Sequence, residues 1–250
     1  MSSNPSLRAI LFDLDGTLRH SLPEGFDAYL EYLTELGHPL TTEQRRNAAR
    51  WNHYYWATST DLVADIKEFS ADSHDFWIRH SERLLAALGV AGDDGLAAHM
   101  HALMRERHSP IHHIPDDVRP TLTRLRAVGY TIALVSNRTE DLGPFTVELG
   151  IDDLFDFTLS AGQANSWKPS PEIFLKAAEK AGCAPREAVY VGDNYYADIE
   201  GAQGAGLLPV LIDPRELFPE AVCPVIHAIH EIEQALIRLG TSAESRASHL

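Results

Sequence analysis

The chain has 250 residues, 44% of them hydrophobic, and its acidic side chains outnumber its basic ones by 15. This composition excludes fibrous, coiled-coil and wholly disordered proteins, and the negative charge disfavours nucleic acids and anionic membranes as partners. The chain has only two cysteines, no apolar run long enough to span a membrane and no secretory signal at the N-terminus. These features predict a cytoplasmic protein.

Six short apolar runs in the sequence have the composition of buried strands. These runs span residues 8–15, 130–136, 155–160, 188–193, 207–213 and 223–229. Helical patterns lie between them, such as 116–129 and 170–182, where Ser170 takes the N-cap position and Pro171 the first helical position. Short buried strands that alternate with helices of roughly 10–15 residues predict an α/β fold with a Rossmann-like parallel sheet.

The segment after the first predicted strand breaks this alternation. It contains no convincing buried strand, but amphipathic helical patterns span 24–37 and 73–89. Thr41 and Gln44 form a capping box that predicts the start of a further helix. The segment is therefore predicted to be all-helical.

We expect the helical segment to form a separate cap domain over residues 21–114, inserted after the first strand. The α/β core domain then consists of residues 1–20 and 115–240. The alternative is that the helices pack on the sheet as part of one domain. Residues 241–250 are small and polar, and we expect them to form a disordered tail.

Carboxylates follow the ends of two predicted strands. Asp13 and Asp15 end the first strand, and Gly16 permits the chain to turn sharply there. Asp193 ends the fourth predicted core strand, and Asp198 follows shortly after it. Carboxylates placed so close together repel one another unless a cation compensates, and Mg²⁺ prefers oxygen ligands. This spacing predicts a magnesium site at the carboxyl ends of the strands.

Other residues at the same edge of the predicted sheet carry groups that suit a phosphate. Ser136 and Asn137 end a strand and offer a hydroxyl and a backbone N–H, which can donate hydrogen bonds to an oxyanion. Lys168 precedes a proline-initiated helix and brings a cation beside the carboxylates. The alternative interpretations are a helix-capping Ser136 and a solvated Lys168.

Together these residues form four motifs, in order, on their predicted elements. The motifs are DLDGT at 13–17, Ser136-Asn137, Lys168-Pro169, and Gly192-Asp193 followed by Asp198. With these motifs the chain resembles the haloacid dehalogenase (HAD) superfamily, in the phosphatase branch whose helical cap follows the first motif. The resemblance covers the core over about 8–17 and 116–213.

The resemblance implies a role for each carboxylate of the core. Asp13 is the expected nucleophile, which becomes an aspartyl-phosphate. Asp15 is the expected general acid and base, which protonates the leaving alcohol and then activates water. The implied cofactor is Mg²⁺, and its implied ligands are Asp13, the backbone carbonyl of Asp15, and Asp193. Asp198 is expected to fix the site without contacting the ion itself.

The remaining motif residues are expected to bind the phosphoryl oxygens. They are Ser136, the backbone of Asn137, and Lys168. The expected function is therefore a Mg²⁺-dependent phosphatase that acts on a small phosphorylated metabolite. The protein is expected to be a monomer or a homodimer.

Several alternative functions stay open. A phosphomutase would use the same core. The dehalogenases of the superfamily lack an aspartate at the position of Asp15, and phosphonate-hydrolysing relatives use a cap lysine, for which the predicted cap offers only Lys67. Outside the hydrolases, the alternative is a receiver-like or catalytically inactive protein that binds phosphate. Receiver domains are shorter, and they lack the leading DxDGT motif.

Substrate selection is expected to come from the predicted cap, since a lid that closes over a site both selects the substrate and excludes water. Arg45 and Arg46 are candidates because they can meet a remote anion of the substrate. Tyr54 and Tyr55 are candidates because they lie in an aromatic run of the second predicted cap helix. The alternative is that these aromatic residues belong to the apolar core of the cap.

Histidines gather in the predicted cap, where eight of the 13 lie between His53 and His113. No Cys or Asp/Glu joins them at a zinc-ligand spacing, so no zinc site is predicted. His20 stands where many relatives have an aspartate. We interpret it as a difference in the hinge, and the alternative is an imidazole near the substrate.

Overall fold

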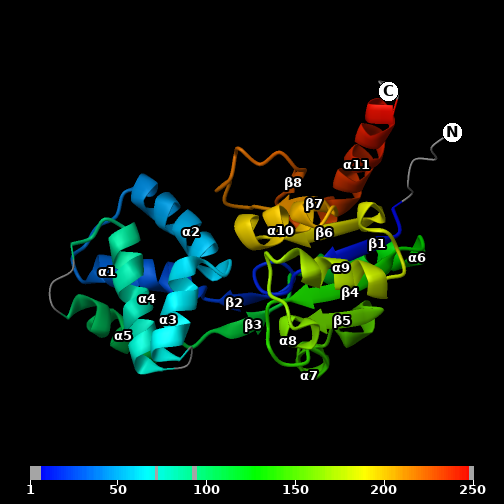
Figure 1. Ribbon diagram of the computed structural model, residues 1–250. Coiled ribbons are helices and arrows are strands. Elements are labelled where there is room, and N and C mark those ends of the chain that lie inside the picture. The colour runs from blue at the N-terminus through cyan, green and yellow to red at the C-terminus, as the bar shows by residue number, and fades with distance from the viewer. Residues whose placement is uncertain (1–6, 71–72, 92–94, 248–250) are drawn as a thin grey trace. The chain divides into compact units, whose positions relative to one another are not determined.

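A six-stranded sheet forms the centre of the α/β part of the chain, in the order β5-β4-β1-β6-β7-β8, with every neighbouring pair parallel (Figure 1). The strands are β1 (Ala9–Phe12), β4 (Thr131–Ser136), β5 (Phe157–Ser160), β6 (Ala188–Gly192), β7 (Leu208–Ile212) and β8 (Val225–Ile226). The computed structural model describes residues 7–70, 73–91 and 95–247, with side chains through residue 240. The predicted α/β class is confirmed, although β8 is shorter than the predicted run.

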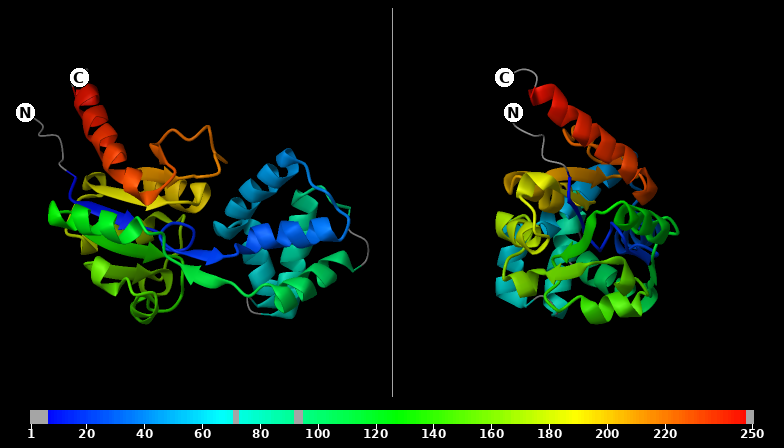
Figure 2. Two further views of the ribbon diagram at one scale, coloured as in Figure 1. Left: turned by 180° about the vertical axis from the view of Figure 1, so that it is seen from behind. Right: turned by 90° about the vertical axis from the view of Figure 1, so that its right-hand side faces the viewer.

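Helices lie on both sides of this sheet, as Figures 1 and 2 show. They are α6 (Val118–Ala127), α7 (Gly143–Glu148), α8 (Ala161–Ala164), α9 (Pro171–Lys180), α10 (Glu200–Gly204) and α11 (Ile232–Ala247). Because side chains alternate along a strand, Ile10 and Phe12 of β1 pack with α6 and α11 on one face. Ala9 and Leu11 pack with α9 and α10 on the other face. Because both faces of β1 are buried, this strand fixes the position of the residues that follow it.

Shorter turns connect these elements. Three are 3₁₀ helices, η1 (Asp152–Leu154), η2 (Pro185–Glu187) and η4 (Ile229–Glu231), and η3 (Tyr195–Ile199) is a π-helical turn after β6. Asn194 caps η3, since its side chain accepts hydrogen bonds from two backbone N–H groups of that turn. Ser170 and Pro171 take their predicted positions at the start of α9, although Ser170 makes no side-chain capping hydrogen bond.

The described chain divides into two compact units. The core unit contains residues 7–20 and 114–247, and the helical unit contains residues 21–113. The helices of the second unit are α1 (Gly25–Glu35), α2 (Thr42–Trp56), α3 (Thr60–Phe69), α4 (His74–Ala87) and α5 (Leu96–Arg107). Each unit has apolar clusters of its own, and none of these clusters mixes residues of the two units.

Hydroxyl side chains fix where three helices of the helical unit begin. Thr41, Ser59 and Ser73 precede α2, α3 and α4, and each accepts a hydrogen bond from a backbone N–H in the first turn of its helix. The predicted capping box of Thr41 with Gln44 is present. These caps set the ends of helices whose apolar faces then pack together.

Two short strands, β2 (His20–Leu22) and β3 (Ile111–His113), pair at the two ends of the helical unit. Three residues are too few to show an alternating pattern, so the sequence does not predict this ribbon. The predicted disordered tail is also corrected in part, because the backbone of 241–247 continues α11. Its Ala, Glu and Arg residues are good helix formers, and 248–250 lie outside the described residues. No helix in the described part of the chain has the length and apolar character of a membrane span.

Candidate active site

Three adjacent strands of the core unit bring the motif residues to one edge of the sheet. β1 lies between β4 and β6, so Asp13 after β1, Ser136 at the end of β4 and Asp193 after β6 come from neighbouring strands. The strands that follow lie on opposite sides, with β5 beyond β4, and β7 and β8 beyond β6. In open parallel sheets, ligands bind at such a point of reversal, beyond the carboxyl ends of the strands.

A buried ammonium group links residues from these strand ends. The Nζ of Lys168 donates hydrogen bonds to Asp13 Oδ1 at 2.6 Å and to Asp198 Oδ1 at 2.7 Å. It also donates to the Tyr190 hydroxyl at 3.1 Å. Asn137 positions the backbone of Lys168, because its Oδ1 accepts from the Lys168 N–H at 2.7 Å and its Nδ2 donates to the Lys168 carbonyl at 3.0 Å. The Lys168 side chain is 3% exposed, which excludes the alternative of a solvated lysine.

Burial and mutual repulsion govern the charges of this cluster. Burial, with repulsion from Asp198 and Asp15, raises the pKa of Asp13 to about 7 in spite of Lys168. Burial raises the pKa of Asp193 well above its ordinary value, and repulsion from Asp13 and Asp198 adds to the effect. Burial alone would lower the pKa of Lys168, but the two neighbouring carboxylates outweigh it and raise that pKa. One ammonium therefore does not fully compensate the buried carboxylates, and a further cation would stabilise them.

The carboxylates fit a divalent metal ion. Asp13, Asp193 and Asp198 offer oxygens that all lie within 4.8 Å of one another, and carboxylate oxygens are preferred ligands of hard cations. Both oxygens of Asp198 already accept hydrogen bonds from the protein, Oδ1 from Lys168 and Oδ2 from the backbone N–H of Asn194 at 2.9 Å. Asp13 and Asp193 are thus better placed to contact an ion, while Asp198 holds Lys168.

The turn after β1 packs directly on Asp193. Gly16 has a φ of +91°, and a Cβ at this position would lie 2.5 Å from the Asp193 Oδ2. The Thr17 hydroxyl donates a hydrogen bond to Asp193 Oδ1 at 3.1 Å. A residue with a side chain would therefore be strained here and would displace the carboxylate.

The carboxylate of Asp15 is paired with two arginines that the sequence did not single out. Arg138 donates from Nε to Asp15 Oδ2 at 2.8 Å and from a terminal nitrogen to Oδ1 at 3.0 Å. Arg19 donates to the same Oδ1 at 2.9 Å. The Arg138 guanidinium also lies over the Phe145 ring, 4.2 Å from its centroid. The Asp15 side chain is 38% exposed, so it is oriented by the protein and still accessible.

Ser136 is buried at the end of β4, and its hydroxyl accepts a hydrogen bond from the backbone N–H of Arg138 at 3.4 Å. No helix begins at this point, because the next helix, α7, starts only at Gly143. The alternative of Ser136 as a helix cap is therefore excluded. Its hydroxyl stands at the same sheet edge as Asp13.

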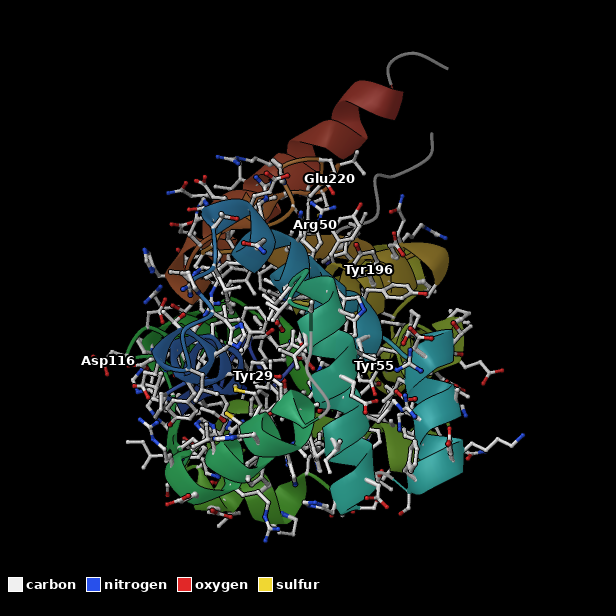
Figure 3. The ribbon with its side chains drawn as sticks, turned by 90° about the vertical axis from the view of Figure 1, so that its left-hand side faces the viewer. Tyr29, Arg50, Tyr55, Asp116, Tyr196 and Glu220 are labelled. Carbon is white, nitrogen blue, oxygen red and sulfur yellow. The ribbon has the colours of Figure 1, made fainter. Side chains whose placement is uncertain are left out.

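The structure separates the four residues that we expected to select the substrate. Tyr55 is fully buried and donates its hydroxyl to Asp65 Oδ2 at 3.0 Å, so it is a core residue of the helical unit with no surface for a ligand (Figure 3). Tyr54 is 43% exposed, and Arg46 is exposed on the same helix. Arg45 donates to backbone and side-chain oxygens near the end of α1. None of the four lines the cavity described below.

The family model of haloacid dehalogenase-like hydrolases matches residues 7–206, which include every motif residue described above. The chain belongs to this family. The protein is therefore an enzyme. Its family motifs lie at the edge of the parallel sheet where the carboxylates gather.

Curated relatives of this HAD-like hydrolase carry the names of phosphatases. A glyceraldehyde 3-phosphate phosphatase of Methanopyrus kandleri is 31% identical over 82% of this chain and 84% of its own length. A ribulose-1,5-bisphosphate 5-phosphatase of Halopiger xanaduensis is 31% identical over 83% of this chain and 85% of its own length. Among solved structures, a 2-haloacid dehalogenase of Pseudomonas syringae matches with a TM-score of 0.54 and 27% identity, over 93% of this chain and 99% of its own.

Proposed function

We propose that this HAD-like hydrolase is a Mg²⁺-dependent phosphatase that hydrolyses a small phosphorylated metabolite by way of a phosphoryl group held on Asp13. The observation that carries the proposal is the buried cluster in which Lys168 joins Asp13 to Asp198, beside Asp193. Phosphoryl transfer requires mainly positioning and charge neutralisation, and this cluster supplies both. The names of the two 31% identical relatives support a sugar phosphate or a similar small phosphate ester as the substrate class.

The first half-reaction uses both carboxylates of the first motif. An Asp13 oxygen forms a bond to phosphorus, while the bond from phosphorus to the oxygen of the leaving alcohol breaks. Protonated Asp15 gives its proton to that oxygen, so the product leaves as a neutral alcohol. The hydrogen bond from Lys168 orients the Asp13 carboxylate for the attack.

The second half-reaction regenerates the enzyme. The Asp15 carboxylate takes a proton from water, and the water oxygen forms a bond to phosphorus. The bond between phosphorus and the Asp13 oxygen breaks, inorganic phosphate leaves, and the Asp13 carboxylate is restored. Asp15 ends this step protonated and ready for the next cycle.

The rest of the site binds the phosphoryl oxygens. The Ser136 hydroxyl and the Asn137 backbone N–H are the hydrogen-bond donors for this group, and the Lys168 ammonium supplies positive charge beside it. Mg²⁺, when bound by Asp13, Asp193 and the backbone carbonyl of Asp15, would neutralise charge on the transferring group. Asp198 contributes indirectly, because its hydrogen bond fixes Lys168.

Carbon–halogen cleavage is the second candidate, since a solved 2-haloacid dehalogenase shares the fold at 27% identity. A halide leaves without needing a proton, so that reaction requires no acid beside the nucleophile. This chain has a carboxylate at Asp15 and orients it with Arg19 and Arg138. The presence of a second carboxylate beside the nucleophile favours the departure of an alcohol over the departure of a halide.

The test is phosphate release from p-nitrophenyl phosphate, with Mg²⁺ and with EDTA, by the wild type and by Asp13→Asn. We expect turnover with Mg²⁺ only, and its loss in Asp13→Asn. Asp152→Asn, a change at an exposed aspartate of η1, is the matched control and should retain wild-type turnover. Phosphate release by Asp13→Asn at the wild-type rate, or halide release from 2-chloropropionate without any phosphatase activity, would contradict the proposal.

A further inference from the structure

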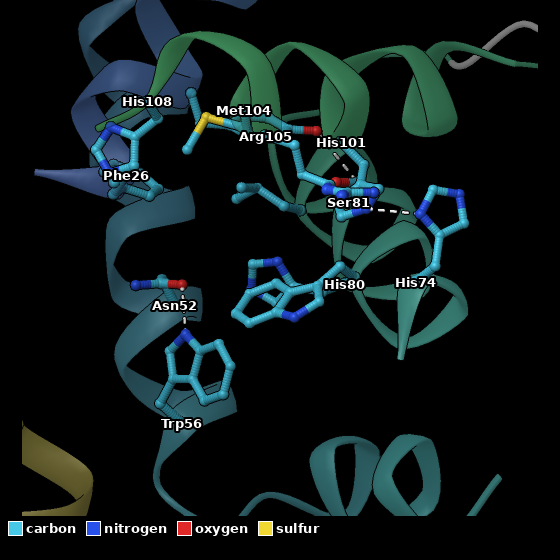
Figure 4. Close-up of a pocket in the computed structure, with 14 residues that line it drawn as sticks. Phe26, Asn52, Trp56, His74, His80, Ser81, His101, Met104, Arg105 and His108 are labelled. Atoms are coloured by element: carbon cyan, nitrogen blue, oxygen red, sulfur yellow. Dashed lines mark hydrogen bonds between the residues drawn. The ribbon is translucent and has the colours of Figure 1, made fainter. Parts of the chain in front are cut away.

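A cavity of about 690 Å³ lies within the helical unit, among residues of α1, α2, α4 and α5. Its volume falls within the range of pockets that hold small molecules. Figure 4 shows its lining side chains pointing toward one another from these helices. No residue of the HAD motifs belongs to it, so the proposed phosphatase chemistry does not explain it.

The lining of the cavity lacks the acidic side chains that are abundant in the chain as a whole. Among the described residues, no aspartate or glutamate lines it, although the chain has 36 such residues and a net charge of −15. Arg105 brings a positive charge to the lining, and four histidines, His74, His80, His101 and His108, line it as well. In a strongly acidic protein, this local exclusion of carboxylates favours an anionic occupant.

Two of the histidines have buried nitrogen atoms without a hydrogen-bond partner. They are the Nε2 of His80 and the Nδ1 of His108. Burial lowers the pKa of His80 to about 4, although the nearby Asp65 opposes this, so the ring is neutral at pH 7. By contrast, His101 Nε2 and His74 Nδ1 lie 2.9 Å apart and satisfy each other. Buried polar atoms in native proteins nearly always have a partner, and here a bound molecule would supply it.

Aromatic rings form another part of the lining. The ring centroids of Trp56 and Trp77 are 6.0 Å apart, and each is within 6 Å of the His80 ring. Trp56 donates from Nε1 to Asn52 Oδ1 at 3.1 Å, which fixes the plane of its ring. Both tryptophans are more than a third exposed in this structure, which leaves ring surface open for contact. Such surface suits a planar ring.

We propose that this cavity is a binding site for a small anion that carries a planar ring. The ring lies against Trp56 and Trp77, and the anionic group faces Arg105 and the histidine nitrogens. The ligand satisfies the unpartnered nitrogen of His80. The site belongs to the helical unit alone, and it binds its ligand whether or not the core unit is turning over substrate.

The test is isothermal titration calorimetry on the full-length protein in EDTA, where the proposed phosphatase reaction is silent. The probe is 1-naphthylacetate, and we expect it to bind with one site per chain. Three comparison probes separate the contributions: 1-naphthylacetamide keeps the ring without the charge, acetate keeps the charge without the ring, and 1-naphthylmethylammonium reverses the charge. We expect each of the three to bind at least about tenfold more weakly. Equal binding of the amide or the ammonium compound would overturn the anionic assignment, and equal binding of acetate would overturn the ring assignment.

Variants then assign the site to this cavity. His80→Phe keeps an aromatic ring but removes the unpartnered nitrogen, and Trp77→Phe reduces the aromatic surface that lines the cavity. We expect each substitution to weaken the binding of 1-naphthylacetate about tenfold. His99→Gln, on the exposed face of α5 and away from the cavity, should leave binding unchanged. Thermal melts verify that each variant is folded. Because the two cavity variants change different residues of the lining, a folding defect in one variant still leaves the other as a test. No binding of 1-naphthylacetate to the wild type, or unchanged binding in both cavity variants, would overturn the proposal.

Discussion

Arg138 holds the carboxylate of Asp15 by two hydrogen bonds, a geometry that a planar guanidinium supplies and an ammonium does not. We expect Arg138→Met to lower kcat for phosphate release roughly ten- to a hundredfold, because Asp15 loses its orientation. Arg138→Lys should restore little of this loss. Steady-state kinetics checks the expectation, with Arg124→Met as the control, since Arg124 lies at the surface. An Arg138→Met enzyme with the kcat of the wild type would refute the positioning role.

Gly16 and Gly37 have nearly the same positive φ, +91° and +89°, but different surroundings. An alanine at either position costs roughly 1–2 kcal/mol in backbone strain. Only at Gly16 would the added Cβ meet a side chain, that of Asp193, because nothing lies within 4 Å at Gly37. We expect both substitutions to Ala to destabilise the protein, and only Gly16→Ala to reduce phosphate release, by about a hundredfold. Urea unfolding and activity assays of the two variants check this, and equal activities would show that the close approach to Asp193 is unimportant.

The sequence predicts only part of the site at this scale. Asp13, Ser136 and Asp193 could be placed together because each follows a recognisable strand, and parallel strands end at one edge. The pairing of Arg138 with Asp15 was not predicted, since 123 residues separate the two and an arginine after a strand has no distinctive pattern. The contact of Lys168 with Tyr190 was missed because an inward-facing tyrosine in a strand looks like ordinary core.

At the scale of elements, one buried carboxylate joins three helices of the helical unit. Asp65 of α3 accepts hydrogen bonds from Tyr55 of α2 at 3.0 Å and from Arg83 of α4 at 2.6 and 2.8 Å. Arg83 also forms an ion pair with Asp61 at 3.0 Å. Burial alone would raise the pKa of Asp65, but Arg83 and Tyr55 outweigh it and bring that pKa below its ordinary value of 3.8.

This network makes the stability of the helical unit depend on pH. Because the pKa of Asp65 is lower in the folded state than in the unfolded state, its contribution is complete above pH 3.8 and declines as the pH falls below that value. We expect Asp65→Asn to lower the free energy of unfolding by about 2 kcal/mol at pH 7 and by less near pH 3.5. Urea unfolding at both pH values measures this, with Glu68→Gln on the exposed side of α3 as control. A loss that is the same at both pH values would mean that the charge of Asp65 is not what matters.

Local sequence signals predicted where the helices lie, but they did not predict which residues of each helix are buried. The capping box at Thr41 and the apolar periodicity placed α1, α2 and α4. An aromatic residue on a helix gives no sign of which side it faces, so Tyr55 entered the list of specificity candidates although it is fully buried. Trp56, one residue on, lines the cavity instead.

At the scale of the whole molecule, the apolar clusters of the core unit are complete without the helical unit. We expect a chain in which residues 23–110 are replaced by a short Gly-Ser linker to fold, because β2 and β3 pair and keep the joined ends close. Far-UV circular dichroism and a thermal melt should show an α/β protein with one cooperative transition. An aggregated product, or one without a transition, would show that the core unit depends on the helical unit for its stability.

The pairing of β2 with β3 also affects how such a protein changes through evolution. An insertion whose two ends are already held together adds little loop-closure entropy to the domain that contains it. Substitutions can therefore remodel the cavity among α1, α2, α4 and α5 without altering the contact between Lys168 and Asp13. Descendants of one ancestral gene can in this way inherit the same chemistry and diverge in the molecules that they recognise.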